Sequence, residues 1–379
     1  MRKDWTETTL GEIASLEYGK PLKEEHRDGE GFPVFGSAGQ VGLHSVPLLQ
    51  VGPNIVVGRK GTAGAVIWTD EPCSVIDTAY YVSQKSNGNL RFLFLALENA
   101  DLPSMSAQTG VPGLNRERAY SKRLSLPPLV EQRRIVDVIE SVDTYINALE
   151  TRAATARTAR SALLHELLSA GGEGWTETTL GEVAAINPEA TSNWPVSREF
   201  RYVDLASVSE SGGIDLAATQ VFTLGEAPGR ARRVVRENDV IVSTVRPYLR
   251  GFARVPRELE ENVASTGFAV LRSTIPRSIP GFVWATVRTQ SFVDYLVDRS
   301  TGSNYPAVRP QDISAFPITL PPLVEQRRIV DVVESVDGAI AAADVAAADA
   351  RDLRSALLSD LLSGDHEIPE SYDRFLAAA

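Results

Sequence analysis

The chain has 379 residues, 43% hydrophobic and 23% charged, which is the composition of a globular protein with two or three domains. Its single cysteine, Cys73, excludes a disulfide framework and a cysteine-based zinc cluster. No apolar run approaches about 18 residues, which excludes a membrane span and a membrane partner. Because the first residues also lack the apolar core of a signal peptide, we expect a cytoplasmic protein.

The net charge of −11 is spread unevenly along the chain. Residues 320–379 carry 12 acidic and 5 basic residues, whereas residues 1–125 and 175–319 are each within one charge of neutrality. Phosphate binding depends on local basic patches and not on the total charge. The acidic total therefore does not exclude a nucleic-acid partner for these two near-neutral segments.

The chain opens with a segment that it later repeats. Residues 5–12, Trp-Thr-Glu-Thr-Thr-Leu-Gly-Glu, recur without change at 175–182. A second repeated segment lies further along the chain from each opening. Residues 126–143 recur at 320–337 with one change in eighteen positions. A duplicated frame of this kind predicts a pseudo-twofold molecule.

The segments inside the frame, residues 13–125 and 183–319, show no convincing similarity to each other. Both contain short β-prone runs punctuated by Gly and Pro, which predicts two different mixed α/β bodies within an α+β chain. Residues 90–97 and 282–297 have the pattern of helices. Two unlike bodies in a common frame suggest two binding heads of different specificity.

The first body carries two polar loops suited to binding. A glycine-flanked loop at 58–64 presents two cations and a hydroxyl, and the segment from 108 adds two amide side chains and a further arginine. Such side chains meet phosphates and base edges in nucleic acids. The candidate residues of this body are Arg59, Lys60, Thr62, Gln108, Asn115 and Arg116.

The first body ends at Leu126-Pro-Pro, after which apolar residues follow a heptad spacing that predicts a long coiled-coil helix closed by Gly171. Its copy after residue 320 has the same phase and ends at Gly364. We expect the two helices to pair with each other, although two separate surface helices are the alternative. The predicted pairing residues are Ile135, Val142, Leu149 and Leu163 in one helix and Ile329, Val336 and Leu357 in the other.

The second body places comparable polar loops ahead of its own Pro-Pro helix. An arginine cluster precedes a Ser-Thr-Val-Arg-Pro-Tyr loop, and a Gly-Ser-Asn-Tyr-Pro loop follows. A solvated loop is an equally good explanation of any one of them, but their similar placement in both bodies favours binding. The candidates are Arg230, Arg232, Arg233, Ser243, Thr244, Arg246, Tyr248, Arg250, Ser303, Asn304 and Tyr305.

These features divide the chain into six segments, the last of which is an acidic tail expected to be frayed. In order they are a first body at 1–125, a helix at 126–170, a linker at 171–174, a second body at 175–319, a helix at 320–364 and the tail at 365–379.

The sequence contains few signs of catalysis. No lysine follows a carboxylate at the two-residue spacing of common metal-dependent nucleases, and neither a phosphate-binding GxxxxGK[ST] nor an HExxH motif is present. The glycine-rich residues 35–39 resemble a methyltransferase cofactor turn, but Pro33 interrupts the preceding strand and no Asn-Pro-Pro-aromatic motif occurs. We therefore expect no catalytic residue, no metal site and no bound cofactor.

The repeated Leu-Pro-Pro-Leu-Val-Glu-Gln-Arg-Arg-Ile at 126–135 and 320–329 resembles a family signature. Together with the Trp-x-x-x-x-Leu-Gly-Glu openings, the loop at 58–64 and the segment at 302–306, it is similar to the specificity (S) subunit of type I restriction–modification systems. The resemblance covers nearly the whole chain.

This resemblance implies two target-recognition domains, each reading one half of a bipartite double-stranded DNA site. It also implies two long antiparallel helices that set the spacing and dock two methyltransferase (M) subunits, with restriction (R) subunits joining them. S-adenosylmethionine, ATP and Mg²⁺ would then be bound only by partner subunits. Two alternatives remain open from the residues: a divergent nuclease or methyltransferase, and a coiled-coil scaffold without a DNA role.

Overall fold

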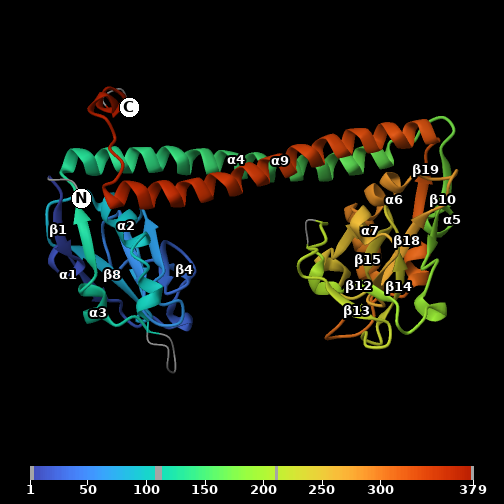
Figure 1. Cartoon of the computed structure of the whole chain (residues 1–379), viewed down its shortest axis with the longest axis horizontal. Coiled ribbons are helices and arrows are strands. Elements are labelled where there is room, and N and C mark those ends of the chain that lie inside the picture. Colours follow the sequence, from blue (N-terminus) through green and yellow to red (C-terminus); the bar gives the residue numbers. More distant parts are fainter. Residues whose placement is uncertain (1–3, 107–112, 210–211, 377–379) are drawn as a thin grey trace. The chain divides into compact units, whose positions relative to one another are not determined.

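The computed structural model describes residues 4–106, 113–209 and 212–376. The chain forms two compact units, the first comprising residues 1–149 and 346–379 and the second residues 150–345 (Figure 1). Two 41-residue helices, α4 (Leu129–Ser169) and α9 (Leu323–Ser363), each contribute to both units. Each unit therefore consists of one body and part of both long helices.

The first body is built on a four-stranded antiparallel sheet in the order β2-β8-β5-β6 and a three-stranded sheet in the order β4-β3-β7. The apolar run of β5 lies in the middle of the larger sheet, where it is buried. The elements are β1 (Thr6–Thr9), α1 (Leu10–Ile13), β2 (Ala14–Tyr18), β3 (Phe32–Gly36), β4 (Gly39–His44), β5 (Asn54–Gly58), β6 (Val66–Thr69), β7 (Ser74–Val75), β8 (Ala79–Gln84), α2 (Leu90–Glu98), α3 (Arg116–Tyr120) and β9 (Arg123–Leu126), with 3-10 turns η1 (Glu24–His26) and η2 (Leu102–Met105).

The second body contains two four-stranded sheets, β11-β18-β15-β16 and β13-β12-β17-β14. Its strands and helices are β10 (Thr176–Thr179), α5 (Leu180–Val183), β11 (Ala184–Ile186), β12 (Glu199–Val203), β13 (Gln220–Thr223), β14 (Ala231–Val235), β15 (Val240–Ser243), β16 (Phe252–Arg254), β17 (Asn262–Ser265), β18 (Phe268–Ser273), α6 (Pro280–Val287), α7 (Gln290–Arg299), α8 (Pro310–Ser314) and β19 (Pro317–Leu320). The 3-10 turns are η3 (Thr191–Asn193), η4 (Leu205–Ser207), η5 (Pro247–Leu249) and η6 (Arg257–Leu259).

Strand β15 lies at the centre of the second body's core. Because successive side chains of a strand point to opposite faces, Val240 and Val242 pack with α6, whereas Ile241 belongs to a separate cluster with residues of the second sheet. The single helix predicted at 282–297 is wrong, since α6 and α7 are separate helices. The side-chain oxygen of Thr289 accepts a hydrogen bond from the Phe292 amide and caps a new helix there.

The same strand pair closes each body. Strand β1 pairs antiparallel with β9 from Thr6 opposite Leu126, and β10 pairs with β19 from Thr176 opposite Leu320. The Pro-Pro segment and the long helix follow directly on the closing strand in both copies. The repeated sequence thus forms the frame around the bodies.

A buried glutamine fixes the start of each long helix to its body. Gln132 donates from Nε2 to the Pro127 carbonyl and accepts through Oε1 from the Asn89 amide, at 2.9 Å in both cases. Gln326 repeats this arrangement, donating to Pro321 at 2.9 Å and accepting from the Ile279 amide at 3.1 Å. The glutamine of the repeat therefore has a structural role that the sequence analysis missed.

The predicted antiparallel pairing of the long helices is confirmed in both units. In the first unit, Ile135 and Ile139 of α4 share a core cluster with Leu358 and Leu361 of α9. In the second unit, Arg160 of α4 pairs with Asp337 at 2.8 Å, and Arg157 pairs with Asp344 at 2.5 Å. Residue numbers rise along α4 as those of their α9 partners fall, which is the antiparallel order.

The predicted pairing residues all lie on the buried or half-buried side of their helices. Ile135 and Ile329 are fully buried, whereas Val142, Leu149, Leu163, Val336 and Leu357 are half-buried. Other positions of the two helices are more deeply buried than the half-buried predicted residues. In the first half of α4, such a position follows each predicted pairing residue by four residues. These more deeply buried positions are Ile139, Ile146, Ala153 and Leu164 in α4, and Val333, Ile340, Ala343, Ala347, Ala350, Leu358 and Leu361 in α9.

The expectation of a frayed tail is wrong for residues 365–376. This segment includes a 3-10 turn, η7 (Glu370–Tyr372), and a short helix, α10 (Asp373–Leu376), and it contacts the beginning of α4 in the first unit (Figure 1). Ile368 is buried in the core of that unit. The apolar contact and the ion pairs described below hold the segment in place.

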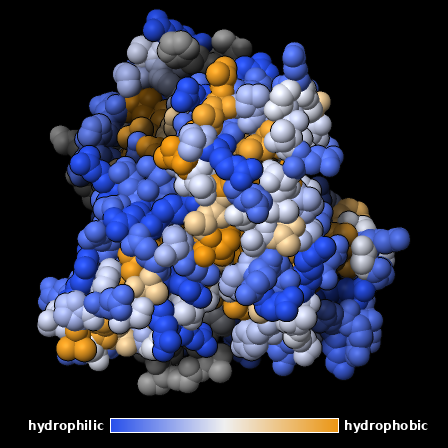
Figure 2. All heavy atoms as spheres, turned by 90° about the vertical axis from the view of Figure 1, so that its right-hand side faces the viewer, coloured by the Kyte–Doolittle hydropathy of each residue, from blue (hydrophilic) through white to orange (hydrophobic). Residues whose placement is uncertain are grey.

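Most large apolar side chains are buried, and the exposed ones are dispersed. Figure 2 shows small groups of apolar side chains among polar ones on the face that it presents. Val51, Val221 and Ile275 are examples of exposed apolar residues in the two bodies. Scattered residues of this kind are usual on protein surfaces.

Candidate nucleic-acid interface

The loop at 58–64 is a tight turn that follows β5. The Gly58 amide donates to the Ala65 carbonyl and the Gly64 amide to the Gly58 carbonyl, both at 2.8 Å. A Cβ atom at position 58 would lie 2.1 Å from the Thr62 carbonyl oxygen, so only glycine fits there. The turn leaves Lys60 and Thr62 exposed and Arg59 half-buried at its base.

The first body brings Arg59 and Arg116 together around one tyrosine. Their guanidinium groups lie 5.0 and 5.1 Å from the ring centroid of Tyr18, which is 50% exposed. A backbone hydrogen bond of 2.9 Å from the Leu114 amide to the Arg59 carbonyl joins the two segments. Two cations over an exposed ring form a positively charged, stacking surface.

The remaining candidates of the first body have different environments. The Asn115 side-chain oxygen accepts a hydrogen bond from the Arg118 amide at 3.1 Å and caps α3, so this oxygen is used within the fold. Gln108 lies outside the described residues. Tyr18 was missed by the sequence analysis because nothing in its local sequence distinguishes it from a core aromatic residue.

In the second body, Arg246 joins the two predicted loops. Its guanidinium lies 4.6 Å from the ring centroid of Tyr305, and its Nη2 donates to the Asn304 carbonyl at 3.1 Å. The Arg246 amide also donates to the Pro306 carbonyl at 2.7 Å. Ser303, Asn304 and Tyr305 are exposed, so this contact presents polar side chains to the solvent.

The two hydroxyl residues before Arg246 bond within the fold. Ser243 donates to the Val245 carbonyl at 2.7 Å, and Thr244 donates to the Gly267 carbonyl at 2.9 Å. Both side chains are buried and hold the loop in shape. Tyr248 is exposed, whereas Arg250 donates to the Arg288 carbonyl and to the Gln290 side chain. Arg250 is therefore directed towards its own body.

The arginine cluster of the second body has three members with different surroundings. The Arg230 carbonyl accepts from the Thr266 amide, next to the Gly267 that contacts Thr244, so the cluster adjoins the Arg246 loop. Arg232 is exposed and donates to the Gly229 carbonyl. Burial, and then the charge of Arg232, lowers the pKa of Arg233 from its usual value.

Two arginines of this region have an unused donor. In the described part of the chain, the Nε atoms of Arg233 and Arg246 are buried and make no hydrogen bond. Because these Nε atoms are shielded from the solvent, a ligand would meet Arg246 through its terminal guanidinium nitrogens, which suit phosphate or the acceptor edge of a base.

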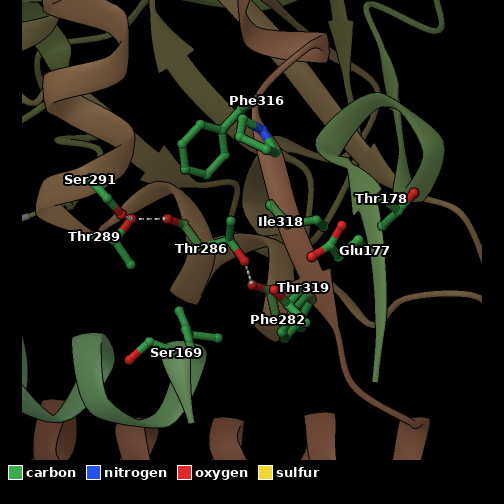
Figure 3. A pocket seen from close by; sticks show the side chains of 12 residues that line it. Ser169, Glu177, Thr178, Phe282, Thr286, Thr289, Ser291, Phe316, Ile318 and Thr319 are labelled. Carbon is green, nitrogen blue, oxygen red and sulfur yellow. Dashed lines mark hydrogen bonds between the residues drawn. The ribbon is translucent and has the colours of Figure 1, made fainter. Parts of the chain in front are cut away.

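A separate hollow of about 540 Å³ lies in the second unit between the end of α4, β10, β19, α6 and α7 (Figure 3). Its polar lining consists largely of hydroxyl groups that bond locally, such as Thr286 to the Phe282 carbonyl at 2.8 Å and Ser291 to Thr289 at 3.1 Å. None of the predicted binding residues lines this hollow.

The described residues contain neither a candidate metal site nor a candidate membrane span. Across residues 4–106, 113–209 and 212–376, no group of three or more His, Cys, Asp or Glu side chains is placed to hold a metal ion. Within those same ranges, no helix combines the length and apolar character that crossing a membrane requires.

Comparison with known proteins identifies the class to which this fold belongs. A crystal structure of a type I restriction–modification S subunit from M. genitalium superposes with a TM-score of 0.60 at 16% identity, covering 96% of this chain and 97% of that one. The chain therefore has the fold of type I specificity subunits, with two sheet-containing bodies and long paired helices, as predicted.

Sequence comparison agrees with the fold. Residues 2–156 match the family model described as type I restriction modification DNA specificity domain. The HindI specificity subunit of Haemophilus influenzae is 21% identical over 173 residues, which are 44% of this chain and 36% of that protein. The MjaVIII specificity subunit of Methanocaldococcus jannaschii is 21% identical over 336 residues, or 79% and 74%.

Proposed function

We propose that this chain is a DNA-specificity subunit that reads a bipartite duplex site, one half with each body. The observation that carries the proposal is that two unlike bodies, closed by the same frame, each place an arginine of a polar loop against an exposed tyrosine ring. Arginine reads guanine edges and phosphates, and an adjacent ring fixes its orientation. Different loops around this pair would give each body its own half-site.

We propose further that chemistry takes place on partner subunits. Two methyltransferase subunits would dock on the repeated frame, one for each copy, and restriction subunits would join this core. S-adenosylmethionine, ATP and Mg²⁺ would be bound by these partners. The duplication supports this assignment, because two copies of one sequence in the frame suit two copies of one partner.

Matched arginine substitutions test the assignment of the half-sites. The complex with methyltransferase subunits is incubated with duplexes in which either half-site is mutated, and affinity is measured at fixed salt. We expect Arg59→Ala to cost about 1–3 kcal/mol and to remove discrimination at one half-site only, and Arg246→Ala to do so at the other.

Lys23→Ala is the control for the loss of a surface charge in the first body, because this lysine is exposed and pairs with the neighbouring Glu25. The proposal fails if both arginine variants weaken both half-sites equally, or if specific binding is unchanged in either variant.

A further inference from the structure

The beginnings of α4 and α9 carry the same charged and apolar side chains. Glu131, Arg134, Asp137 and Val138 form what we call the α4 face, and Glu325, Arg328, Asp331 and Val332 form the α9 face. The spacing of three and four residues places each set on one side of its helix. The sequence of both faces is identical, yet their surroundings differ.

The C-terminal segment, residues 365–376, covers the α4 face. Arg134 forms a two-pronged ion pair with Asp373, in which Nε and Nη2 each lie 2.6 Å from a carboxylate oxygen. The Tyr372 hydroxyl donates to Asp137 at 2.5 Å. With Ile368 buried beside these contacts, the Arg134 side chain is only 9% exposed.

No described segment covers the α9 face in the same way. The Arg328 side chain is 68% exposed and pairs with Glu325 of its own helix at 2.9 Å. Val332 is 39% exposed, whereas its counterpart Val138 is half-buried and packs on the core with Tyr372. Within the described residues there are thus two faces of one sequence, and a segment covers the α4 face but not the α9 face.

We propose that the α9 face binds a segment of a partner protein with the chemistry of residues 368–373, an apolar side chain followed four residues later by Tyr-Asp. The covered α4 face shows which groups this surface accepts: a carboxylate on the arginine and a phenol on the aspartate. Two parallel hydrogen bonds from one guanidinium to one carboxylate are strong and directional. This inference concerns protein docking and is independent of DNA reading.

A second copy of this chain is a poorer occupant of the α9 face. Its own C-terminal segment is already held on its own α4 face, and a tethered segment has an effective concentration that a free molecule rarely reaches. A partner whose matching segment is not tied to an α4 face meets no such competition.

A synthetic peptide with the sequence of residues 365–379 serves as the probe. It is titrated into the full chain without DNA, and binding is followed by isothermal calorimetry. We expect one saturable site, weakened on the order of tenfold or more by Arg328→Ala because the two-pronged ion pair is lost. A peptide carrying Asp373→Asn should be weakened similarly.

The neighbouring arginine provides a control for this experiment. Arg327→Ala removes an exposed arginine one position earlier, on another side of α9, so it should leave the affinity of the α9 face for the peptide undiminished. The inference is overturned if the peptide does not saturate at millimolar concentration, or if Arg328→Ala does not weaken it.

Sedimentation of the chain alone tests the other occupant. A concentration-dependent dimer that disappears on removal of residues 365–379 would assign the α9 face to a second copy and overturn the partner proposal. A monomer at all concentrations supports it. Because neither measurement contains DNA, failure here is distinguishable from failure of the proposed DNA reading.

Discussion

At the scale of single residues, arginine side chains occur in two kinds of environment in this chain. Some are directed at exposed aromatic rings, as Arg246 is at Tyr305. Others are enclosed by carboxylates, as Arg236 is by Glu189, Glu260 and Glu261. The arginines paired with carboxylates stabilise the body that carries the arginines directed at rings. Separate substitutions can test the two groups.

Tyr18 should contribute to DNA binding through the two arginines that flank it. Tyr18→Ala removes both cation–π contacts, and we expect the affinity for the first half-site to fall by about 0.5–2 kcal/mol. Tyr18→Phe keeps the ring and should bind nearly as well as the parent in the same assay. Equal losses from both substitutions would show that the hydroxyl matters and not the ring.

Glu189 should make the second body sensitive to acid. Hydrogen bonds from Arg236 and then Arg272, acting against partial burial, lower the pKa of Glu189 from its usual 4.5 to about 2. A lowered pKa stabilises the folded state above pH 4.5, and this contribution is lost as pH falls from 4.5 towards 2.

Glu189→Gln measures this contribution. Chemical unfolding should show the variant to be less stable than the parent at neutral pH, and the difference should shrink as the pH falls below 4.5. A difference that stays constant down to the acid limit would contradict the assignment.

At the scale of elements, the start of each long helix is fixed by a glutamine. Replacing Gln326 by alanine leaves the half-buried Ile279 amide without its acceptor, and we expect a cost of about 1 kcal/mol. Hydrogen exchange should then be faster at Ile279 and unchanged at Asn89. Gln132→Ala should have the opposite result, since Gln132 accepts from the Asn89 amide. If either variant showed faster exchange at both the Asn89 and the Ile279 amide, the two glutamines would not act independently.

The long elements could be predicted from the sequence, because their signal is repeated many times. Five heptads at one phase determine the two helices, and the eighteen-residue repeat relates them to each other. The break between α6 and α7 could not be predicted, since it depends on a single hydroxyl of Thr289 that caps α7. A single side-chain hydrogen bond to the backbone leaves only a weak signal in the sequence, yet it decides where one helix ends and the next begins.

The candidate interface was predicted less completely than the helices. Arg59 with Arg116 and Arg246 with Tyr305 are brought together by backbone bonds between loops distant in sequence, which no local pattern reveals. Tyr18 lies at the end of β2, far in sequence from Arg59, which packs on its ring. The docking of Asp373 on Arg134 joins residues 239 apart, so an acidic terminus read alone suggested a free tail.

At the scale of the whole molecule, α4 and α9 are shared by both units, so their length should control the distance between the two DNA contacts. Seven residues inserted after Leu149 and seven after Val345 keep the heptad phase in both helices. Such an insertion adds about 10 Å of helix, equivalent to about three base pairs. We expect the unspecified spacer of the site to lengthen accordingly, with both half-sites unchanged.

Mapping of methylated sites in cells carrying this variant measures the spacer directly. The same seven residues placed in the linker at 171–174 should leave the spacer as it was. An unaltered spacer in the helix variant would refute the role of the helices in setting distance.

The frame holds each body through main-chain groups. Gln132 accepts from the amide of an asparagine in one copy, and Gln326 accepts from the amide of an isoleucine in the other. Almost every amino acid can supply that amide, so the frame places little demand on the enclosed sequence. We therefore expect that a gene acquiring a new body between unaltered flanks would encode a protein whose closing strands and helix starts form as before.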